Sequence, residues 1–313
     1  MFEIKRYEPS HEQAWNDFVA RSKNGTFLFD RRFMDYHSDR FADSSLIILR
    51  KGRIYALLPA NRVGDTLHSH QGLTYGGLLT DAKATAEGVM EAFGALNAWL
   101  RNEGVRRVTY KAMPWIYHRL PAEEDLYALT QVCHARLLTR EISSTILLQQ
   151  PLRFTESRKS GLRKALREGL YMEESGDMAA FWQMLDDNLA SRHHTHPVHS
   201  LDELRLLQGR FPQQIHLYLI YNKEKEPVGG TWVFDTGQVV HTQYIASTEE
   251  GKAHGALDLL FDELINRRYR EGIYLDFGKS TEEGGRVLNE HLIFQKEGFG
   301  GRGVCYDTYE WEP

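Results

Sequence analysis

The stretch that decides the fold is residues 227–277, which read PVGGTWVFDTGQVVHTQYIASTEEGKAHGALDLLFDELINRRYREGIYLDF. Alternating apolar residues on both sides of an Asp/Gly turn predict two neighbouring strands, 228–234 and 239–246. After a polar loop, an apolar stripe at helical spacing predicts a helix that ends before Gly272. Residues 273–277 alternate again, as a half-buried strand does. The stretch therefore predicts strand, strand, helix and strand with few spare residues.

This element order resembles the core of the GCN5-related N-acetyltransferase (GNAT) fold, in which an acyl carrier lies over the N-terminus of the helix. Three further segments are similar to the Fem-like branch of that superfamily: DFGKST at 276–281, GRVLN at 285–289 and QKEGFGG at 295–301. The resemblance implies a mixed α/β (α+β) chain of two tandem GNAT-like acyl-CoA N-acyltransferase domains. We place their boundaries at 1–149 and 150–313.

The first half of the chain has a similar order of predicted elements. A hairpin over 46–60 is followed by a helix, 84–102, and by a strand, 105–111. A repeated element order is what duplication of one domain leaves behind. Pro151 marks the change of domain. The alternative architecture is one acyltransferase domain with an unrelated N-terminal domain.

Composition is that of an ordinary soluble globular protein, with 42% hydrophobic and 26% charged residues. The net charge of −5 provides no overall basic field, which argues against DNA as a partner. The two cysteines supply neither a disulfide framework nor a zinc site by themselves. The N-terminus lacks the apolar core of a signal peptide, and no apolar run approaches a membrane span. We therefore expect a cytoplasmic protein.

The loop before the predicted helix holds the candidate donor-binding residues. In the wider GNAT fold, a basic residue or Gln is followed by Gly three positions on and by Gly or Ala five positions on. Lys252, Gly255 and Ala256 resemble this coenzyme A loop, although Leu257 stands where the last small residue is expected. The resemblance implies acyl-CoA or aminoacyl-tRNA as donor substrate and no tightly bound cofactor. The other interpretation is a loop that glycines shape before a core helix.

The segment LHSHQGLTYGGL at 67–78 is a candidate acceptor-binding loop. Its glycines let backbone approach a ligand, while His70 and Tyr75 offer hydrogen bonds and stacking. The Fem-like resemblance implies that this loop lines the acceptor site. Arg40 resembles, more loosely, part of a basic cluster that would hold an acidic acceptor. The structural alternatives are a tight glycine-rich turn and a solvated charged face.

A second candidate loop, RHHTHPVHS at 192–200, has four histidines within seven residues. No cysteine or carboxylate stands at ligand spacing, so we expect no bound metal. The resemblance to the Fem-like pattern implies an acceptor-pocket role for His196, and neutral His199 is a natural general base for an amine. Ser200 is expected to cap the following helix. A surface loop without a role is the alternative.

Acyl transfer to an amine needs a stabiliser for the tetrahedral oxyanion but no covalent enzyme intermediate. No Gly-x-Ser-x-Gly elbow occurs, so we expect direct transfer in a ternary complex. Lys296 resembles the Fem-like position that stabilises the transferring acyl group. On the 239–246 strand, Tyr244 is the candidate to reprotonate the leaving group, and His241 is a candidate substrate-binding residue. For Lys296 the alternative is a surface lysine lying over Phe299.

These features predict an N-acyltransferase that moves an acetyl or aminoacyl group to an amine of a sugar, a peptide or a bacterial-type cell-envelope precursor. Its partners would be a small-molecule or peptidoglycan-precursor acceptor, and also tRNA where tRNA carries the acyl group. A basic helix expected at 156–168 would contact phosphates of the RNA or of a nucleotide-linked acceptor, and the alternative is a plain solvated helix. The alternative is a non-catalytic ligand-binding or scaffold protein that retains the acyltransferase fold. The sequence leaves the acyl group, the acceptor and the oligomeric state open.

Overall fold

The computed structural model describes residues 1–193 and 198–313 and divides the chain into two compact units. The expected domain boundary at 149/150 stays a prediction, and two short later segments group with the first part of the chain in unit 1. Unit 1 comprises Met1–Glu141, Thr281–Val287 and Cys305–Pro313, and unit 2 comprises Ile142–Ser280 and Leu288–Val304.

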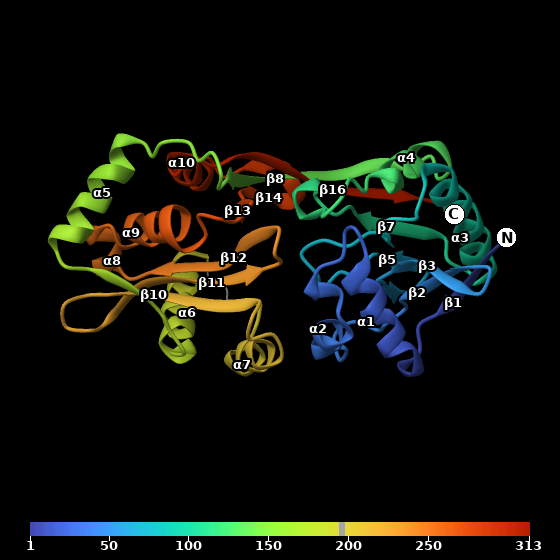
Figure 1. Ribbon diagram of the computed structural model, residues 1–313, viewed down its shortest axis with the longest axis horizontal. Coiled ribbons are helices and arrows are strands. Elements are labelled where there is room, and N and C mark those ends of the chain that lie inside the picture. Colours follow the sequence, from blue (N-terminus) through green and yellow to red (C-terminus); the bar gives the residue numbers. More distant parts are fainter. Residues whose placement is uncertain (194–197) are drawn as a thin grey trace. The chain divides into compact units, whose positions relative to one another are not determined.

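Unit 1 is a mixed α/β domain (Figure 1). β1, β2, β3 and β6 pair antiparallel in that order, and β4, β5, β7 and β16 form a second run. The core of the unit packs α3 against these strands. The strands are β1 (Phe2–Arg6), β2 (Leu46–Arg50), β3 (Arg53–Leu58), β4 (Asn61–Val63), β5 (Thr66–His68), β6 (Leu79–Thr80), β7 (Arg107–Lys111) and β14 (Thr281–Glu282). Three more strands have residues in both units: β8 (Arg136–Leu147), β15 (Val287–Leu288) and β16 (Arg302–Trp311). The helices are α1 (Glu12–Arg21), α2 (Arg31–Met34), α3 (Ala86–Asn102) and α4 (Glu124–Gln131).

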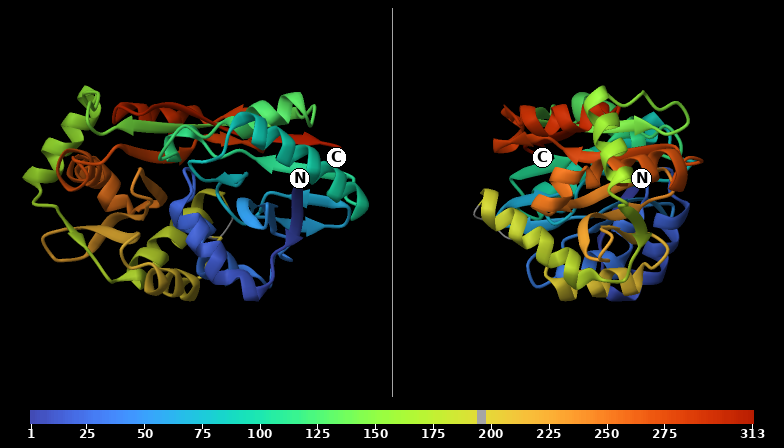
Figure 2. Two further views of the ribbon diagram at one scale, coloured as in Figure 1. Left: turned by 45° about the vertical axis from the view of Figure 1, so that its right-hand side comes forward. Right: turned by 90° about the vertical axis from the view of Figure 1, so that its left-hand side faces the viewer.

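Unit 2 is also mixed α/β, with the strand order β8, β13, β12, β11, β10 and β9. Helix α9 contacts one face of β10 and β11, and α6 contacts β11 and β12 from the other (Figure 1, and from a second side in Figure 2). The strands are β9 (Tyr171–Glu174), β10 (Ile215–Tyr221), β11 (Pro227–Asp235), β12 (Val239–Ser247) and β13 (Tyr274–Lys279). The helices are α5 (Glu156–Arg167), α6 (Met178–His193), α7 (Leu201–Arg210), α8 (Glu249–His254), α9 (Ala256–Glu263) and α10 (Glu290–Gly298).

Each unit contains a parallel strand pair with a helix between its strands in sequence, as the repeated element order predicted. In unit 1, β5 pairs with β7 and α3 lies between them. In unit 2, β12 pairs with β13, and α8 and α9 lie between them. A further strand then pairs antiparallel with the second member: β16 with β7, and β8 with β13. The expected mixed α/β fold is therefore confirmed.

The parallel pairing of β12 with β13 in unit 2 is short, and the two strands are apart beyond it. Residues 239–241 of β12 pair with residues 274–276 of β13, and the pairing ends at His241 and Asp276. Beyond that point β12 continues to Ser247 on β11, while Lys279 of β13 pairs with β8. The two strands thus separate after their third residue pair.

The helical segment after β12 is divided by its own residues. Thr248 caps α8 by accepting a hydrogen bond from the backbone of Gly251. Gly255 then takes a left-handed conformation with a φ of 77°, which favours glycine. The buried face of α9 follows, and a π turn over Leu264–Arg268 ends the segment. The single helix expected to end before Gly272 is therefore three consecutive helical pieces.

Over residues 1–193 and 198–313, no helix combines the length and the apolar character that crossing a membrane requires.

Candidate active site

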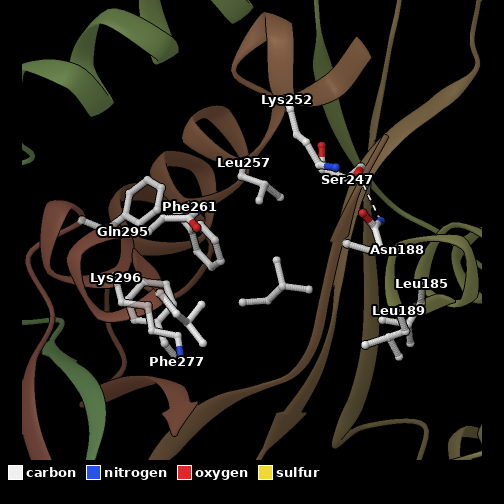
Figure 3. A pocket seen from close by; sticks show the side chains of 14 residues that line it. Leu185, Asn188, Leu189, Ser247, Lys252, Leu257, Phe261, Phe277, Gln295 and Lys296 are labelled. Atoms are coloured by element: carbon white, nitrogen blue, oxygen red, sulfur yellow. Dashed lines mark hydrogen bonds between the residues drawn. The ribbon is translucent and has the colours of Figure 1, made fainter. Parts of the chain in front are cut away.

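A cavity of about 320 Å³ opens in unit 2 where β12 and β13 separate. In Figure 3 the end of β12 and helix α6 form one side, α9 and α10 form the other, and Lys252 and Lys296 stand at opposite ends. Most of the lining is apolar, as ligand pockets usually are. The lining residues are Leu185, Asn188, Leu189, Ile245, Ala246, Ser247, Lys252, Leu257, Phe261, Phe277, Leu292, Gln295, Lys296 and Phe299.

Lys296 of α10 is buried at the end of β13, with 5% of its surface exposed. Its Nζ donates to the carbonyls of Gly278 and Lys279 at 2.8 and 2.9 Å and to Ser280 Oγ at 2.9 Å. Burial lowers the pKa of Lys296 to about 8, and the charge of Asp276 opposes this shift. Lys296 is thus a cavity-lining cation whose three donors hold the end of β13, and the surface-lysine alternative is wrong.

Asp276 is fully buried beside the opening and accepts hydrogen bonds from two neighbouring strands. Ser143 Oγ and Thr145 Oγ1 of β8 donate to Asp276 Oδ1, the latter at 2.8 Å. His241 Nδ1 of β12 lies 2.9 Å from Asp276 Oδ2. Burial alone would raise the pKa of Asp276, but the bonds from His241, Ser143 and Thr145 outweigh it and lower that pKa. The carboxylate is therefore ionised at neutral pH.

Tyr244 and His199 form a second hydrogen-bonded pair in unit 2. His199 Nδ1 lies 2.6 Å from Tyr244 Oη, and the indole of Trp182 donates to the His199 carbonyl at 3.2 Å. Burial raises the pKa of Tyr244 to about 12, so its hydroxyl keeps its proton at neutral pH. Neither side chain lines the cavity, although Ile245 next to Tyr244 does, and the roles of His199 as general base and of Tyr244 as proton donor stay predictions.

Of the predicted donor-binding residues, one lines the cavity and two are packed inside the unit. Lys252 lines the cavity and pairs with Glu249. Gly255, by contrast, lies so close to α5 that a Cβ there would be 2.4 Å from the carbonyl oxygen of Gly161. Ala256 is fully buried. This packing favours the interpretation of a glycine-shaped loop, and donor contact by Gly255 and Ala256 stays a prediction.

We expect Gly255→Ala to destabilise the protein, because it combines left-handed strain with a collision against backbone. The free energy of unfolding should fall by at least about 2 kcal/mol. Gly209→Ala is the matched control, since an added Cβ there meets nothing within 4 Å near the end of α7. Urea unfolding of both variants measures the difference, and equal stabilities would contradict the packing assigned to Gly255.

The predicted acceptor residues of the 67–78 loop are buried in unit 1. His70 is 3% exposed with a left-handed φ of 62°, and its ring stacks on His37. Burial, followed by the charges of His37, Lys111 and Arg31, lowers the pKa of His70 to about 3. Tyr75 is 2% exposed, and its hydroxyl lies 3.1 Å from Thr26 Oγ1. Substrate contact by His70 and Tyr75 stays a prediction.

Arg40 lies in unit 1 after α2, with its guanidinium over the ring of Tyr36 and 3.9 Å from Asp39. His196 lies outside the described residues, as do the neighbouring residues 194–197. Ser200, which follows this loop, caps α7 in a capping box with Glu203, as predicted. Acceptor binding by Arg40 and His196 stays a prediction, as does the absence of a metal.

The site also contains residues that the sequence analysis did not single out. Asp276 interrupts an otherwise apolar alternation in the predicted strand 273–277, and this was the signal available for it. Ser143 and Thr145 stand in a predicted strand, but nothing local pairs them with Asp276. Asn188 of α6 lines the cavity and donates to the Ser247 carbonyl at 3.1 Å, across more than fifty residues of sequence.

Comparison with known proteins agrees with this fold. Residues 155–284 match a family model described as an acetyltransferase (GNAT) domain. By sequence, no curated protein matches the chain. The crystal structure of FemX is similar with a TM-score of 0.68 at 11% identity, covering 99% of this chain and 97% of that one.

Two other solved structures have a similar fold at comparably low sequence identity. L-PGS from Bacillus licheniformis has a TM-score of 0.61 at 13% identity, with 97% of this chain and 92% of that chain covered. A tandem GNAT protein from the clavulanic acid biosynthesis pathway has a TM-score of 0.51 at 12% identity, with 100% and 98% covered. Residues 155–284 therefore match the GNAT acetyltransferase domain family, and the fold of the whole chain is similar to that of FemX and of a tandem GNAT protein.

Proposed function

We propose that this protein is an N-acyltransferase that transfers an acyl group directly to an amine within a ternary complex. The observation that carries the proposal is the apolar cavity between the separated ends of β12 and β13, with the buried ammonium of Lys296 at one end. An apolar cavity accommodates an acyl chain, and a cation in a poorly solvated site stabilises a developing oxyanion.

In the proposed reaction Lys296 acts through its charge. Its three donors already bind protein acceptors, so its field rather than a new hydrogen bond lowers the energy of the tetrahedral oxyanion. Tyr244 is proposed to return a proton to the leaving group. Its raised pKa keeps the hydroxyl protonated, and its bond to His199 offers a route by which the proton is replaced.

The donor is proposed to be acyl-CoA, with aminoacyl-tRNA as the second candidate. Lys252 supports a phosphate-bearing donor because it lines the cavity with 28% of its side chain exposed. The acceptor is proposed to be an amine of a sugar, a peptide or a cell-envelope precursor. Leu257, which stands where the coenzyme A loop has a small residue, instead favours the alternative, a binding or scaffold protein that retains the fold.

A transfer assay tests the proposal. Purified protein is incubated with acetyl-CoA or aminoacyl-tRNA and a panel of amino sugars, peptides and peptidoglycan precursors, and mass spectrometry detects the amide product. We expect an acylated amine that appears only with active protein. Donor binding without any amide product would support the scaffold alternative instead.

A further inference from the structure

We propose that unit 1 contains a second ligand site, a basic pocket that binds a small organic molecule through two or more linked phosphate groups. The pocket has a volume of about 900 Å³, and all of its lining residues belong to Met1–Glu141. It shares no residue with the cavity of unit 2, and the proposal does not depend on acyl transfer. The lining residues are Arg21, Arg50, Lys51, Arg53, Ile54, Tyr55, Asp81 and Lys83.

The first support is the charge of the basic pocket. Five of its eight lining side chains are cations and one, Asp81, is a carboxylate, which gives a formal charge of +4, whereas the whole chain has a net charge of −5. Among the residues that the structure describes, Arg50 is the one cation of the pocket that pairs with a carboxylate, Glu91 at 3.5 Å. Like charges that line a concave surface raise the local concentration of counter-ions. The pocket therefore favours a ligand with several negative charges.

The second support is the turn between β2 and β3, which carries three of the cations. Lys51 and Gly52 both have left-handed φ values, 51° and 72°, as a two-residue hairpin turn requires. The strands on either side place Arg50 and Arg53 directly opposite each other. Two like charges in such a pair weaken a hairpin. An anion bound between the two guanidinium groups would remove this repulsion.

The third support is that aromatic rings hold two of the guanidinium groups. Arg50 lies over the rings of Phe2 and Tyr55, at 5.2 and 5.9 Å from their centres. Arg21, at the end of α1, lies 4.7 Å from the ring centre of Phe18. Such contacts use the flat face of a guanidinium, while its N–H groups lie in the plane and donate sideways. Pairs of N–H groups in one plane match the oxygen atoms of a phosphate.

The fourth support is the helix that begins beside the basic pocket. Lys83 stands two residues before Thr85, which is the N-cap of the 17-residue helix α3. Tyr55 lies against the first turn of that helix, because an added Cβ on Gly88 would be 2.3 Å from Tyr55 Oη. The positive end of the helix dipole therefore adjoins the pocket and adds to its attraction for phosphate. Glu87 in the same turn is exposed and does not line the pocket.

These features together indicate the class of ligand. A single carboxylate or phosphate would leave most of the positive charge unpaired, whereas two linked phosphates carry about three negative charges. Ile54 and Tyr55 provide an apolar wall for the organic part of the molecule. Because the cations line a concave pocket, a small molecule fits this site better than a membrane or a nucleic acid does.

Calorimetric titration of the full chain with inorganic pyrophosphate and with ADP tests the proposal. Both should bind saturably at low salt and more tightly than inorganic phosphate, and their affinity should fall as salt is added. Arg53→Gln and Lys83→Gln should each weaken binding about tenfold, because each variant removes one charged donor. Both side chains are exposed, so neither substitution should disturb the fold.

Two control variants show whether the loss is local. Arg106→Gln removes the same charge from another pocket of unit 1, which Asp65 and Glu312 also line. Lys252→Gln removes the same charge from the cavity of unit 2. Both controls should bind pyrophosphate as wild type does. Binding that Arg53→Gln leaves unchanged, or that a control weakens as much as Arg53→Gln, would overturn the proposal.

A second measurement uses wild-type protein alone. In an NMR titration with pyrophosphate, the backbone amide signals of Gly52 and Lys83 should shift while that of Arg106 stays in place. Wild-type protein that binds neither pyrophosphate nor ADP would overturn the proposal, and so would inorganic phosphate that binds as tightly as pyrophosphate. Tighter binding of an RNA oligonucleotide, or of vesicles that contain an anionic lipid, through Arg53 would overturn the assignment to a small molecule.

Discussion

Lys296→Met should lower kcat by about a hundredfold while the affinity for the acyl donor stays nearly unchanged. Methionine keeps the length of the side chain in the cavity wall and removes only its charge and its donors. If the charge of Lys296 stabilises the oxyanion, the loss is confined to the transition state. The measurement is steady-state kinetics beside calorimetric titration of the donor, with Lys223→Ala on the exposed β10–β11 turn as the control.

The stability of Lys296→Met shows whether its loss of activity comes from the missing charge or from disturbed packing. The variant loses three hydrogen bonds, but it also removes a buried ammonium, so the free energy of unfolding should fall by no more than about 3 kcal/mol. Lys296→Arg should recover little activity, because a planar guanidinium does not fit a site shaped for an ammonium. If both variants kept the wild-type kcat, a residue other than Lys296 would have to stabilise the oxyanion.

The pH dependence gives a second readout of the same residue. Burial lowers the pKa of Lys296 from 10.5 to about 8, so the folded protein releases this proton before the unfolded chain does. Between those pH values the unfolded chain binds more protons, and the free energy of unfolding should rise with pH in wild type relative to Lys296→Met. The rate that needs the charge should fall over the same range. A rate and a stability that fall together would contradict this assignment.

The parts of the fold that sequence predicted are those set by local patterns. Two local patterns predicted elements that the structure contains. The alternation over residues 228–246 predicted the strand pair, and the apolar stripe after Gly255 predicted the helix. Ser200 is predictable as a cap because its partner, Glu203, stands three residues away. The helix expected at 84–102 was found at Ala86–Asn102.

The parts that sequence did not predict depend on distant segments. The last strand of the chain, β16, pairs with β7, and no local pattern specifies that pairing. Gly161 occupies the space beside Gly255 although nearly a hundred residues separate them. Asp276 obtains its partners from β8 and β12, so its place in the sequence indicated a polar residue in a strand but not these partners.

Blocking the cavity should abolish donor binding. Leu257 of α9 lines the cavity, and tryptophan at that position would occupy the space assigned to the acyl group. Leu206→Trp is the matched control, because Leu206 is 41% exposed on α7 and does not line the cavity. Unfolding temperatures of both variants show whether the larger side chain affects only the cavity.

The measurement that tests the account most directly is calorimetric titration of wild type, Leu257→Trp and Leu206→Trp with acetyl-CoA, followed by aminoacyl-tRNA. The account predicts saturable binding of one donor by wild type and by Leu206→Trp. It also predicts affinity at least about a hundredfold weaker, a difference of about 2.7 kcal/mol, for Leu257→Trp. Wild-type protein that binds neither donor, or Leu257→Trp that binds as tightly as wild type, would contradict the assignment of this cavity to the acyl donor.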